Sequence, residues 1–392
     1  MLNPKEMENI LTFRVKHSRI FLKTFGAARQ KITGNGVKQK LKAERRPVRA
    51  WLVSHLKNIY YTFRAKDWVR SAKHIVCKEL KNCTFDCVYS SYPSYQTHLV
   101  AHYAQKKHIA GKWVADFRDP MAYMGFDKYE YKRSIQKQHR IERWADCVTV
   151  VSEGALEKFR FPDVPDRKLT YIPNGYDPED FSVDTQSGEK NDNILRLFYA
   201  GTLYEGRRDL SILFCAIAEL IEDGLIQKEF IEVEYAGNEW PVLYSFADNY
   251  GLAGICRGYG YVPRSQVMEI MAQVDITLVC SLNTAEDRGV VTGKLFELLL
   301  VEKPIIAIVN GNLPDSELAQ IVRDCDAGVV FEEATAERDY PQLKRWLLEV
   351  YESKQKCGSV FSTLRCDKRE QYSYETIAKH LVAIFDDLCD EK

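Results

Sequence analysis

Short apolar runs alternate with longer stretches of mixed polarity through the second half of this sequence. Each run is long enough for a strand buried on both faces, and each intervening stretch is long enough for a helix. The apolar runs occupy residues 196–201, 230–236, 258–262, 275–280, 305–309 and 327–331. This alternation predicts a Rossmann-like α/β domain with a parallel sheet over residues 195–371.

The first half shows the same alternation, but it begins only near Phe85. The expected strands lie at residues 85–91, 112–116 and 147–152, with helical stretches between them. They predict a second Rossmann-like domain at 74–178, in which the usual first strand is missing. Polar residues without a period indicate a linker at 179–194, and the last helical pattern predicts a closing helix within 372–392.

Residues 1–73 are basic and have apolar positions at helical spacing, in 7–32 and again in 52–63. The segment holds 18 Lys and Arg against 4 Asp and Glu, although the formal net charge of the chain is +0. Two interpretations remain open. The helices either cover the first sheet with a solvated basic face, or they form a surface for anionic lipid headgroups. Nucleic acid is disfavoured because no known binding motif accompanies the charge.

Composition favours a globular protein of a reducing compartment. The chain has 392 residues, of which 45% are hydrophobic and 28% charged, enough for two domains with separate cores. Its 11 cysteines are scattered, with no CxxC pair and no zinc spacing. No signal peptide is visible, and no apolar run approaches the roughly 20 residues of a membrane span. We therefore expect a cytoplasmic protein.

The richest stretch for chemistry is 287–309, which predicts a loop, a helix and a buried strand. The helix begins near Thr292, Gly293 and Lys294, where free N–H groups and the helix dipole favour an anion such as a diphosphate. Lys294 would add a full charge, and Glu297 lies one turn on, at a spacing suited to ribose hydroxyls. An ordinary strand–helix–strand crossover with solvated charges is the alternative.

A second candidate loop follows the strand at 196–201. Gly201 at the strand end would let backbone N–H groups approach a phosphate, and Arg207 or Arg208 could pair with it in a bidentate manner. Because both loops follow strands of the same predicted sheet, they are expected at the same edge.

These motifs resemble the nucleotide-sugar site of retaining GT-B glycosyltransferases of glycosyltransferase family 4. The resemblance is carried by Lys294-Leu-Phe-Glu297, by Gly201 with Arg207 six residues later, and by Ile172-Pro-Asn-Gly-Tyr-Asp-Pro. It covers about residues 68–390. This sequence departs from the family pattern at Gly289, where many members have Glu, and at Thr202, where they have Arg.

The resemblance implies a GT-B fold, with two Rossmann-like domains whose parallel sheets face each other across a cleft, and an incomplete N-terminal domain preceded by basic helices. It implies a nucleotide-diphosphate sugar as donor, transfer with retention, and no metal or other cofactor. Residues implied at the donor are Gly201, Thr202, Arg207, Arg208, Tyr259, Thr292, Gly293, Lys294, Leu295 and Glu297. Arg118 and Asp119 would act on the acceptor side, and together with Arg207 and Lys294 they are the implied catalytic residues.

The acceptor would be a glycan or a lipid-linked glycan, as in surface polysaccharide synthesis, with the protein at the inner face of a membrane. One rival is a nucleotide-sugar epimerase on the same fold, which would need acid and base side chains that the sequence does not clearly offer. Another is a degenerate, non-catalytic relative that only binds partners. The Asp324-Cys-Asp326 pair matches a metal signature of a different transferase fold, but its position between a helix and a strand favours a turn.

Overall fold

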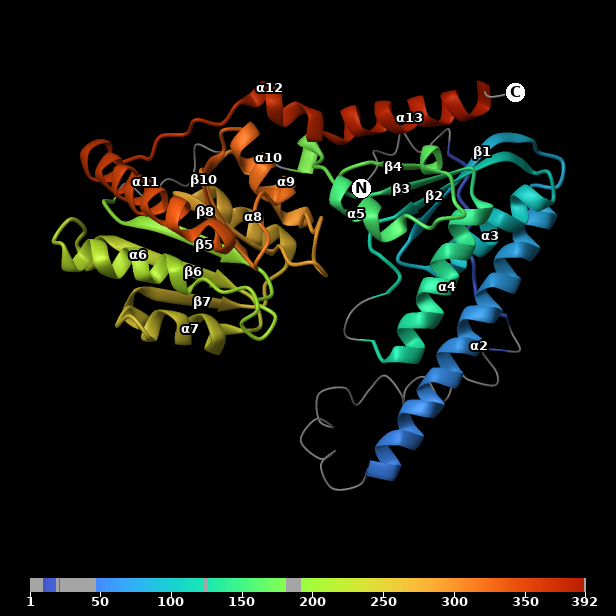
Figure 1. Cartoon of the computed structure of the whole chain (residues 1–392), viewed down its shortest axis with the longest axis horizontal. Helices are drawn as coiled ribbons and strands as arrows, with labels where there is room; N and C mark the ends of the chain where they lie inside the picture. The colour runs from blue at the N-terminus through green and yellow to red at the C-terminus, as the bar shows by residue number, and fades with distance from the viewer. Residues whose placement is uncertain (1–9, 19–20, 22–46, 123–125, 181–191, 391–392) are drawn as a thin grey trace. The chain divides into compact units, whose positions relative to one another are not determined.

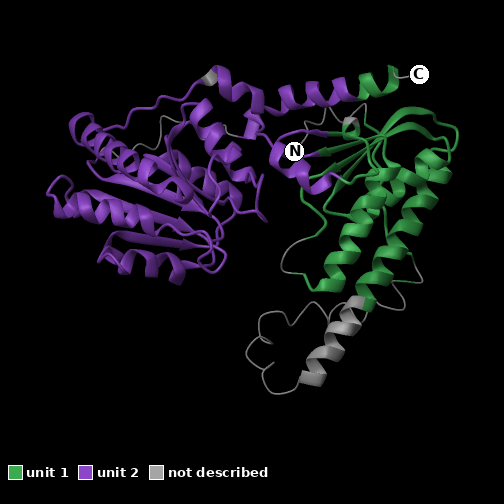
Figure 2. Ribbon diagram, in the orientation of Figure 1, with its two compact units in different colours: residues 1–149, 161–169, 385–392 green, residues 150–160, 170–384 purple. Residues whose placement is uncertain are grey.

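The computed structural model of the chain describes residues 10–18, 21, 47–122, 126–180 and 192–390. The chain divides into two compact units (Figure 2). Unit 1 comprises residues 1–149, 161–169 and 385–392, and unit 2 comprises residues 150–160 and 170–384.

The first sheet has four strands in the order β1-β2-β3-β4 (Figure 1). The strands are β1 (Phe85–Tyr92), β2 (Ala110–Phe117), β3 (Cys147–Val150) and β4 (Leu169–Tyr171). β1 and β2 run parallel, with Phe85 opposite Ala110. Among the described residues no strand precedes β1, so the sheet begins where the apolar pattern begins.

Three helices accompany the strands of unit 1: α2 (Pro47–Glu79), α3 (Tyr95–Lys106) and α4 (Lys128–Trp144). α3 packs on β1, β2 and α2. A hydrogen bond of 2.9 Å joins Cys77 Sγ of α2 to the Tyr103 hydroxyl of α3. The second helical pattern of the N-terminal segment therefore belongs to one long helix that covers α3.

The first helical pattern is only partly described, and its described part is not helical. Residues 10–18 have no regular structure, which contradicts the predicted helix there. The reason is a tertiary contact: Asp67 of α2 accepts hydrogen bonds from the backbone N–H of Ser18 (2.9 Å) and from its hydroxyl. Phe21 is buried against Tyr60 of α2, with ring centroids 5.9 Å apart. Residues 22–46 and 181–191, which include much of the predicted linker, lie outside the described residues.

Unit 2 contains a six-stranded parallel sheet in the order β10-β9-β8-β5-β6-β7. Its strands are β5 (Leu195–Ala200), β6 (Ile231–Ala236), β7 (Cys256–Gly260), β8 (Ile276–Leu282), β9 (Ile305–Asn310) and β10 (Gly328–Glu332). The chain builds outward from β5 in one direction and then returns to β5 and builds in the other. This is the strand order of a doubly wound fold, with its switch point between β5 and β8.

Both faces of this sheet are covered by helices. Alternate strand side chains such as Leu197 and Phe198 enter two separate core clusters. The helices of the first cluster are α6 (Ser211–Glu222), α7 (Trp240–Asp248) and α11 (Ala336–Cys357); those of the second are α8 (Arg264–Gln273), α9 (Gly293–Val301) and α10 (Glu317–Asp324). The unbroken apolar strands predicted from the sequence are explained by this double covering.

The remaining helices are α5 (Glu153–Leu156), α12 (Cys366–Arg369) and α13 (Tyr374–Asp390). Just before α13, the backbone pairs with the Pro-Asn-Gly-Tyr segment: Tyr176 N–H donates to Tyr372 O (3.0 Å), and Tyr374 N–H donates to Tyr176 O (2.9 Å). A Cβ at Gly175 would lie 2.4 Å from Tyr372 O. Only glycine therefore allows this close approach at that position of the motif.

Candidate functional site

The two candidate loops of unit 2 meet at the switch point of its sheet. β5 ends at Ala200 and leads to Gly201, whereas β8 ends at Leu282 and its loop leads to α9. A Cβ built on Gly201 would lie 3.4 Å from Lys294 Nζ and 3.0 Å from the Tyr199 hydroxyl. Gly201 and Lys294, which lie far apart in the sequence, are therefore neighbours at the edge where doubly wound folds bind ligands.

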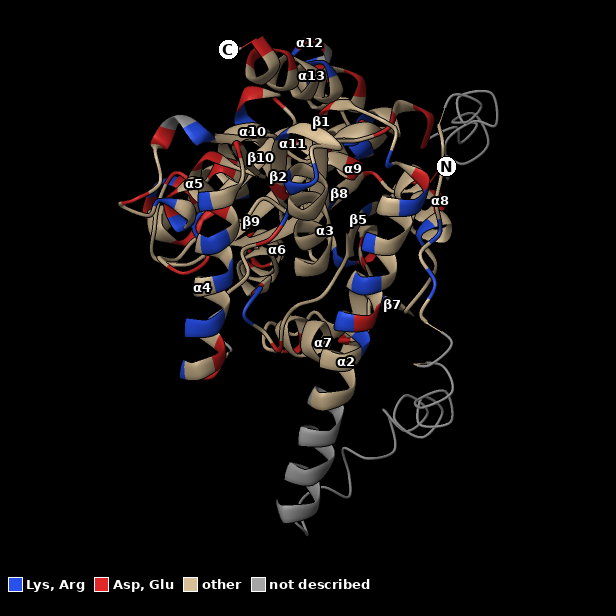
Figure 3. Ribbon diagram, turned by 90° about the vertical axis from the view of Figure 1, so that its right-hand side faces the viewer, with Lys and Arg blue, Asp and Glu red and all other residues tan. Residues whose placement is uncertain are grey.

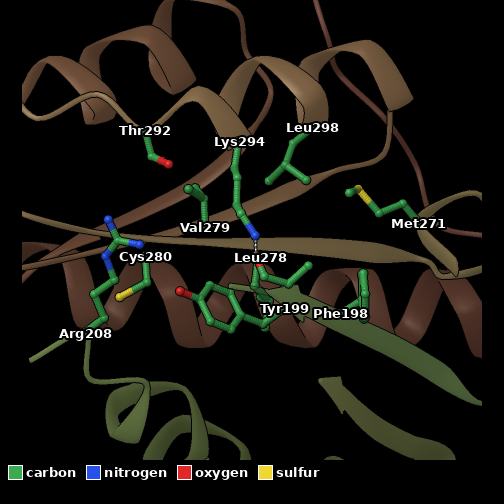
Figure 4. A pocket seen from close by; sticks show the side chains of 11 residues that line it. Phe198, Tyr199, Arg208, Met271, Leu278, Val279, Cys280, Thr292, Lys294 and Leu298 are labelled. Atoms are coloured by element: carbon green, nitrogen blue, oxygen red, sulfur yellow. Dashed lines mark hydrogen bonds between the residues drawn. The ribbon is translucent and has the colours of Figure 1, made fainter. Parts of the chain in front are cut away.

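Lys294 points from α9 toward β5, and Arg208 lies on the other side of the same small pocket, beside Cys280 (Figure 4). Lys294 Nζ donates a hydrogen bond to Ala200 O, and burial lowers the pKa of its ammonium group. The pocket has a volume of about 10 Å³, close to the least that holds one water molecule. A pocket of this size is too small to hold a nucleotide.

Arg208 is half-buried and lines this small pocket. Its guanidinium lies over the Tyr204 ring, 4.8 Å from the centroid. Its Nε atom is buried and, among the described residues, has no hydrogen-bond partner. A buried donor without a partner is costly, which makes this nitrogen a candidate to bind an anion.

Arg207 is more exposed, and it connects the two loops. Its Nη2 donates to Asp287 Oδ2 at 2.7 Å, and Thr284 Oγ1 donates to the same oxygen at 3.0 Å. The Arg207 side chain is 61% exposed. An ion pair this exposed contributes at most about 1 kcal/mol of stability, so a diphosphate could replace Asp287 as its partner at little cost.

The start of α9 is open. Thr292 precedes the helix without a side-chain cap, and a Cβ at Gly293 would meet no atom within 4 Å. Leu295, by contrast, is fully buried in the core, and its N–H donates to Thr292 O at 3.1 Å, so this residue fixes the start of the helix. The N-terminus of α9 therefore has room for an anion at its positive end.

Glu297 lies one turn further along α9, and its carboxylate accepts a hydrogen bond from Arg264 Nε at 2.8 Å. Arg264 begins α8 and also donates to Asp180 Oδ2 at 3.0 Å. The hydrogen bond to Glu297 is the main cause that raises the pKa of the Arg264 guanidinium. Arg264 thus holds the carboxylate predicted to bind ribose.

Tyr259 lies on β7, and its hydroxyl donates to Glu234 of β6 at 2.6 Å. Its ring packs edge-on against Phe198, and the Arg257 guanidinium lies 5.1 Å from its centroid. The hydroxyl is thus used within the sheet. Contact between this ring and a base stays a prediction.

The predicted acceptor residues lie in unit 1, at the carboxyl end of β2. Arg118 Nε donates to Asp116 Oδ2 at 2.9 Å, and Asp119 is exposed next to it. Asp116 is fully buried and also accepts hydrogen bonds from Ser91 of β1 (2.7 Å) and Thr149 (2.8 Å). One buried carboxylate therefore joins the carboxyl ends of neighbouring strands and holds Arg118 in place.

Sequence reasoning missed Asp116 and Arg264. It also missed Glu239, whose contacts are described below. Asp116 and Glu239 share one recognisable signal, because each is an acidic residue at or just after the carboxyl end of a predicted strand. Arg264 directly follows Pro263 at the start of a helix, which gave no such signal.

No protein-family model and no curated protein matches this chain. Solved structures do match it. A structure of HepE from Anabaena in complex with UDP has a TM-score of 0.57, with 14% identity over 82% of each chain. The chain has the GT-B fold. Sucrose-phosphate synthase from Thermosynechococcus elongatus (TM-score 0.55, 14% identity, 82% of this chain and 77% of that one) and the lipopolysaccharide outer core galactosyltransferase WaaB (0.51, 15%, 82% and 80%) match over a similar span.

At this level of identity the similarity shows the fold alone. It confirms the predicted architecture of two Rossmann-like units with parallel sheets, and the structure gives these sheets four and six strands. In the part of the chain that the structure describes, no helix combines the length and apolar character that a membrane crossing requires.

Proposed function

We propose that this chain is a glycosyltransferase that binds a nucleotide-diphosphate sugar at the carboxyl edge of the unit 2 sheet. The observation that carries the proposal is the meeting of Gly201, Lys294 and the open N-terminus of α9 at the switch point between β5 and β8. HepE, a structural neighbour with the same fold, has been solved with UDP and with UDP-glucose.

In this proposal the donor diphosphate lies over the small pocket, between the two loops. Lys294, Arg207, Arg208 and the positive end of α9 would stabilise the negative charge that develops as the diphosphate leaves. These groups would supply the charge that a metal ion supplies in other transferases, so the proposed reaction is metal-independent. Glu297 would accept hydrogen bonds from the ribose, and the β7 region around Tyr259 would hold the base.

The transfer is proposed to retain the anomeric configuration, as the family 4 resemblance implies. Arg118 and Asp119 are proposed to orient a glycan or lipid-linked acceptor in the synthesis of a surface polysaccharide. The protein would act in the cytoplasm. Asp116 supports the role of Arg118, because a buried and fully hydrogen-bonded carboxylate gives a guanidinium a fixed direction.

We also propose that unit 1 touches an anionic membrane surface. Lys and Arg residues recur along α4 and the described part of α2 (Figure 3). Exposed aromatic side chains lie among them, with Tyr129 87% and Phe63 52% exposed. Basic residues interleaved with exposed aromatic rings favour an interfacial position. The protein should co-sediment with vesicles that contain anionic lipid but not with neutral vesicles; equal recovery with both would contradict the proposal.

The donor site is tested by calorimetric titration with UDP-, GDP- and ADP-sugars, on this chain and on Glu297→Ala. We expect one base to bind, and the affinity to fall at least tenfold in Glu297→Ala because two ribose hydroxyls lose a charged acceptor. Glu352→Ala, an exposed glutamate of α11, is the matched control. Slow release of nucleotide from the bound donor would support turnover. Binding of no donor would contradict the proposed function and favour a non-catalytic protein.

A further inference from the structure

The loop after β5 has an unusual backbone conformation. Tyr204, Glu205 and Gly206 have φ angles of 54°, 57° and 95°. Residues with a Cβ avoid this left-handed region, so two consecutive ones need a partner that holds them there. Glu239, which directly precedes α7, is that partner. Its carboxylate accepts the N–H groups of Leu203 (2.6 Å), Tyr204 (3.1 Å) and Glu205 (2.8 Å).

Three successive N–H groups that converge on one point form a concave anion-binding nest. In this chain the anion in the nest is the protein's own carboxylate. These hydrogen bonds, led by the one from Glu205 N–H, lower the pKa of the Glu239 carboxyl. Glu239 therefore stays ionised at neutral pH and keeps the nest occupied.

The turn between β6 and α7, which contains Glu239, also holds the beginning of the loop after β5. The Tyr235 hydroxyl donates to Gly201 O (2.9 Å) and accepts the N–H of Glu239 (3.2 Å). A Cβ at Gly237 would lie 2.5 Å from Gly201 O, so the turn between β6 and α7 packs directly against Gly201. Both Gly201 and the nest are thus tied to one turn of the neighbouring strand.

The two arginines proposed to bind the diphosphate come directly after the nest. Arg207 N–H donates to Tyr204 O (3.1 Å), and Arg208 N–H donates to Leu203 O (3.0 Å). Their backbone positions are therefore set by residues that Glu239 holds. If the carboxylate were lost, the left-handed residues would have no partner in the nest. The backbone of Arg207 and Arg208 would then no longer be held in one position.

We infer that Glu239 is a positioning residue for the donor diphosphate, which it serves by locking the loop that presents Arg207 and Arg208. The inference rests on the proposed function. The inference predicts the direction in which diphosphate affinity changes when the Glu239 charge is removed. Removal of a nearby negative charge should by itself strengthen the binding of a diphosphate, whereas loss of positioning should weaken it.

The test compares the unaltered chain with Glu239→Gln by calorimetry. The ligands are the nucleoside diphosphate that the chain binds (UDP, GDP or ADP), the matching nucleoside, and pyrophosphate. Glu205→Gln is the matched control, because it removes one negative charge from the loop that Glu239 holds and leaves the nest acceptor in place. Thermal unfolding reports stability separately. If Glu239→Gln does not fold, Glu239→Asp takes its place, since it keeps the charge and withdraws it by one methylene.

We expect the Kd for the diphosphate and for pyrophosphate to rise roughly ten- to a hundredfold in Glu239→Gln, by analogy with the loss of affinity when partners that orient metal ligands are removed. The Kd for the nucleoside should not change, and Glu205→Gln should bind as well as or better than the unaltered chain. If the role of Glu239 were purely structural, Glu239→Gln would lower the melting temperature and leave the ratio of the Kd for the diphosphate to the Kd for the nucleoside unchanged. That result would overturn the inference.

Tighter diphosphate binding in Glu239→Gln would also overturn it, because Glu239 would then be a competitor for the nest. If the unaltered chain binds none of the diphosphates, both the proposed function and this inference fail. Binding to the unaltered chain with equal affinity in the variant contradicts the inference alone.

Discussion

The carboxyl edges of the two sheets carry polar residues in opposite ways. In unit 2 the candidate charged residues lie on loops and on helices, and the Arg207–Asp287 pair is partly exposed, with side chains 61% and 24% exposed. In unit 1 the central carboxylate, Asp116, is fully buried, and its partners come from the ends of neighbouring strands. The first arrangement can exchange its partners for a ligand, whereas the second is fixed.

Strand order explains this difference. The unit 2 sheet changes direction between β5 and β8, the position at which open α/β sheets leave a crevice for a ligand, and the two loops meet there. The described strands of unit 1 follow one another in plain sequence order, without a reversal. Its strand ends therefore lie close together, and their polar groups satisfy one another. A charged residue at a strand end points to a ligand site mainly where the sheet reverses.

The comparison is tested most strongly by stability. Asp116→Ala should lower the free energy of unfolding by about 3–5 kcal/mol, because it leaves a half-buried arginine and two hydroxyls without their buried acceptor. Asp287→Ala removes the same side chain from the exposed pair and should cost at most about 1 kcal/mol. Urea unfolding of both variants gives the two values. Equal losses would mean that the two edges do not differ as described.

Donor affinity provides the next largest effect. Lys294→Ala should weaken binding of the donor nucleotide by about ten- to a hundredfold, since a charge-assisted hydrogen bond contributes about 1.5–3 kcal/mol. Lys356→Ala, on the exposed face of α11, is the matched control and should bind normally. Titration calorimetry measures both. If the two variants bind alike, Lys294 only closes the pocket under the site.

Lys294 and Gly201 show which parts of the candidate site could be predicted from the sequence. Lys294 was predicted because its chemistry is local: a helix start, a glycine and a lysine follow one another behind an apolar strand. Gly201 was predicted for the same reason. Asp116 and Glu239 are harder to assign, because their partners Thr149 and Leu203 lie more than thirty positions away in the sequence. The only local signal that the two share is an acidic residue near the end of a predicted strand.

In the described part of the N-terminal segment a local pattern predicted an element that the structure does not contain. Its helical spacing predicted a helix through residues 10–18, but Asp67 binds the backbone of Ser18 and that stretch is irregular. Here a single tertiary contact overrides a periodicity that a short segment can satisfy by chance.

A smaller effect is expected at the predicted ribose residue. Arg264→Ala should raise the Kd for the donor nucleotide about three- to tenfold, because Glu297 keeps its charge but loses the side chain that directs it. Glu297→Ala should lower affinity more. The double variant should then bind like Glu297→Ala alone, since the arginine acts through the carboxylate. Additive losses in the double variant would instead mean that Arg264 contacts the donor directly.

The smallest effect is the pH dependence of the nest in unit 2. The pKa of Glu239 is lowered below its ordinary value of 4.5, mainly by the N–H of Glu205 and further by those of Leu203 and Tyr204. The stabilisation from the ionised carboxylate is therefore fully present above about pH 4.5, and it is lost as the pH falls through the lowered pKa. The side chain in Glu239→Gln does not titrate in this pH range.

Melting temperatures measured from pH 7 to pH 3 on both chains isolate this contribution, because the other carboxylates titrate in both and cancel in the difference. The advantage of the unaltered chain should be constant at neutral pH and should shrink below pH 4.5. A difference that does not vary with pH would mean that the neutral acid holds the loop as well as the carboxylate, and the nest would then depend on shape and not on charge.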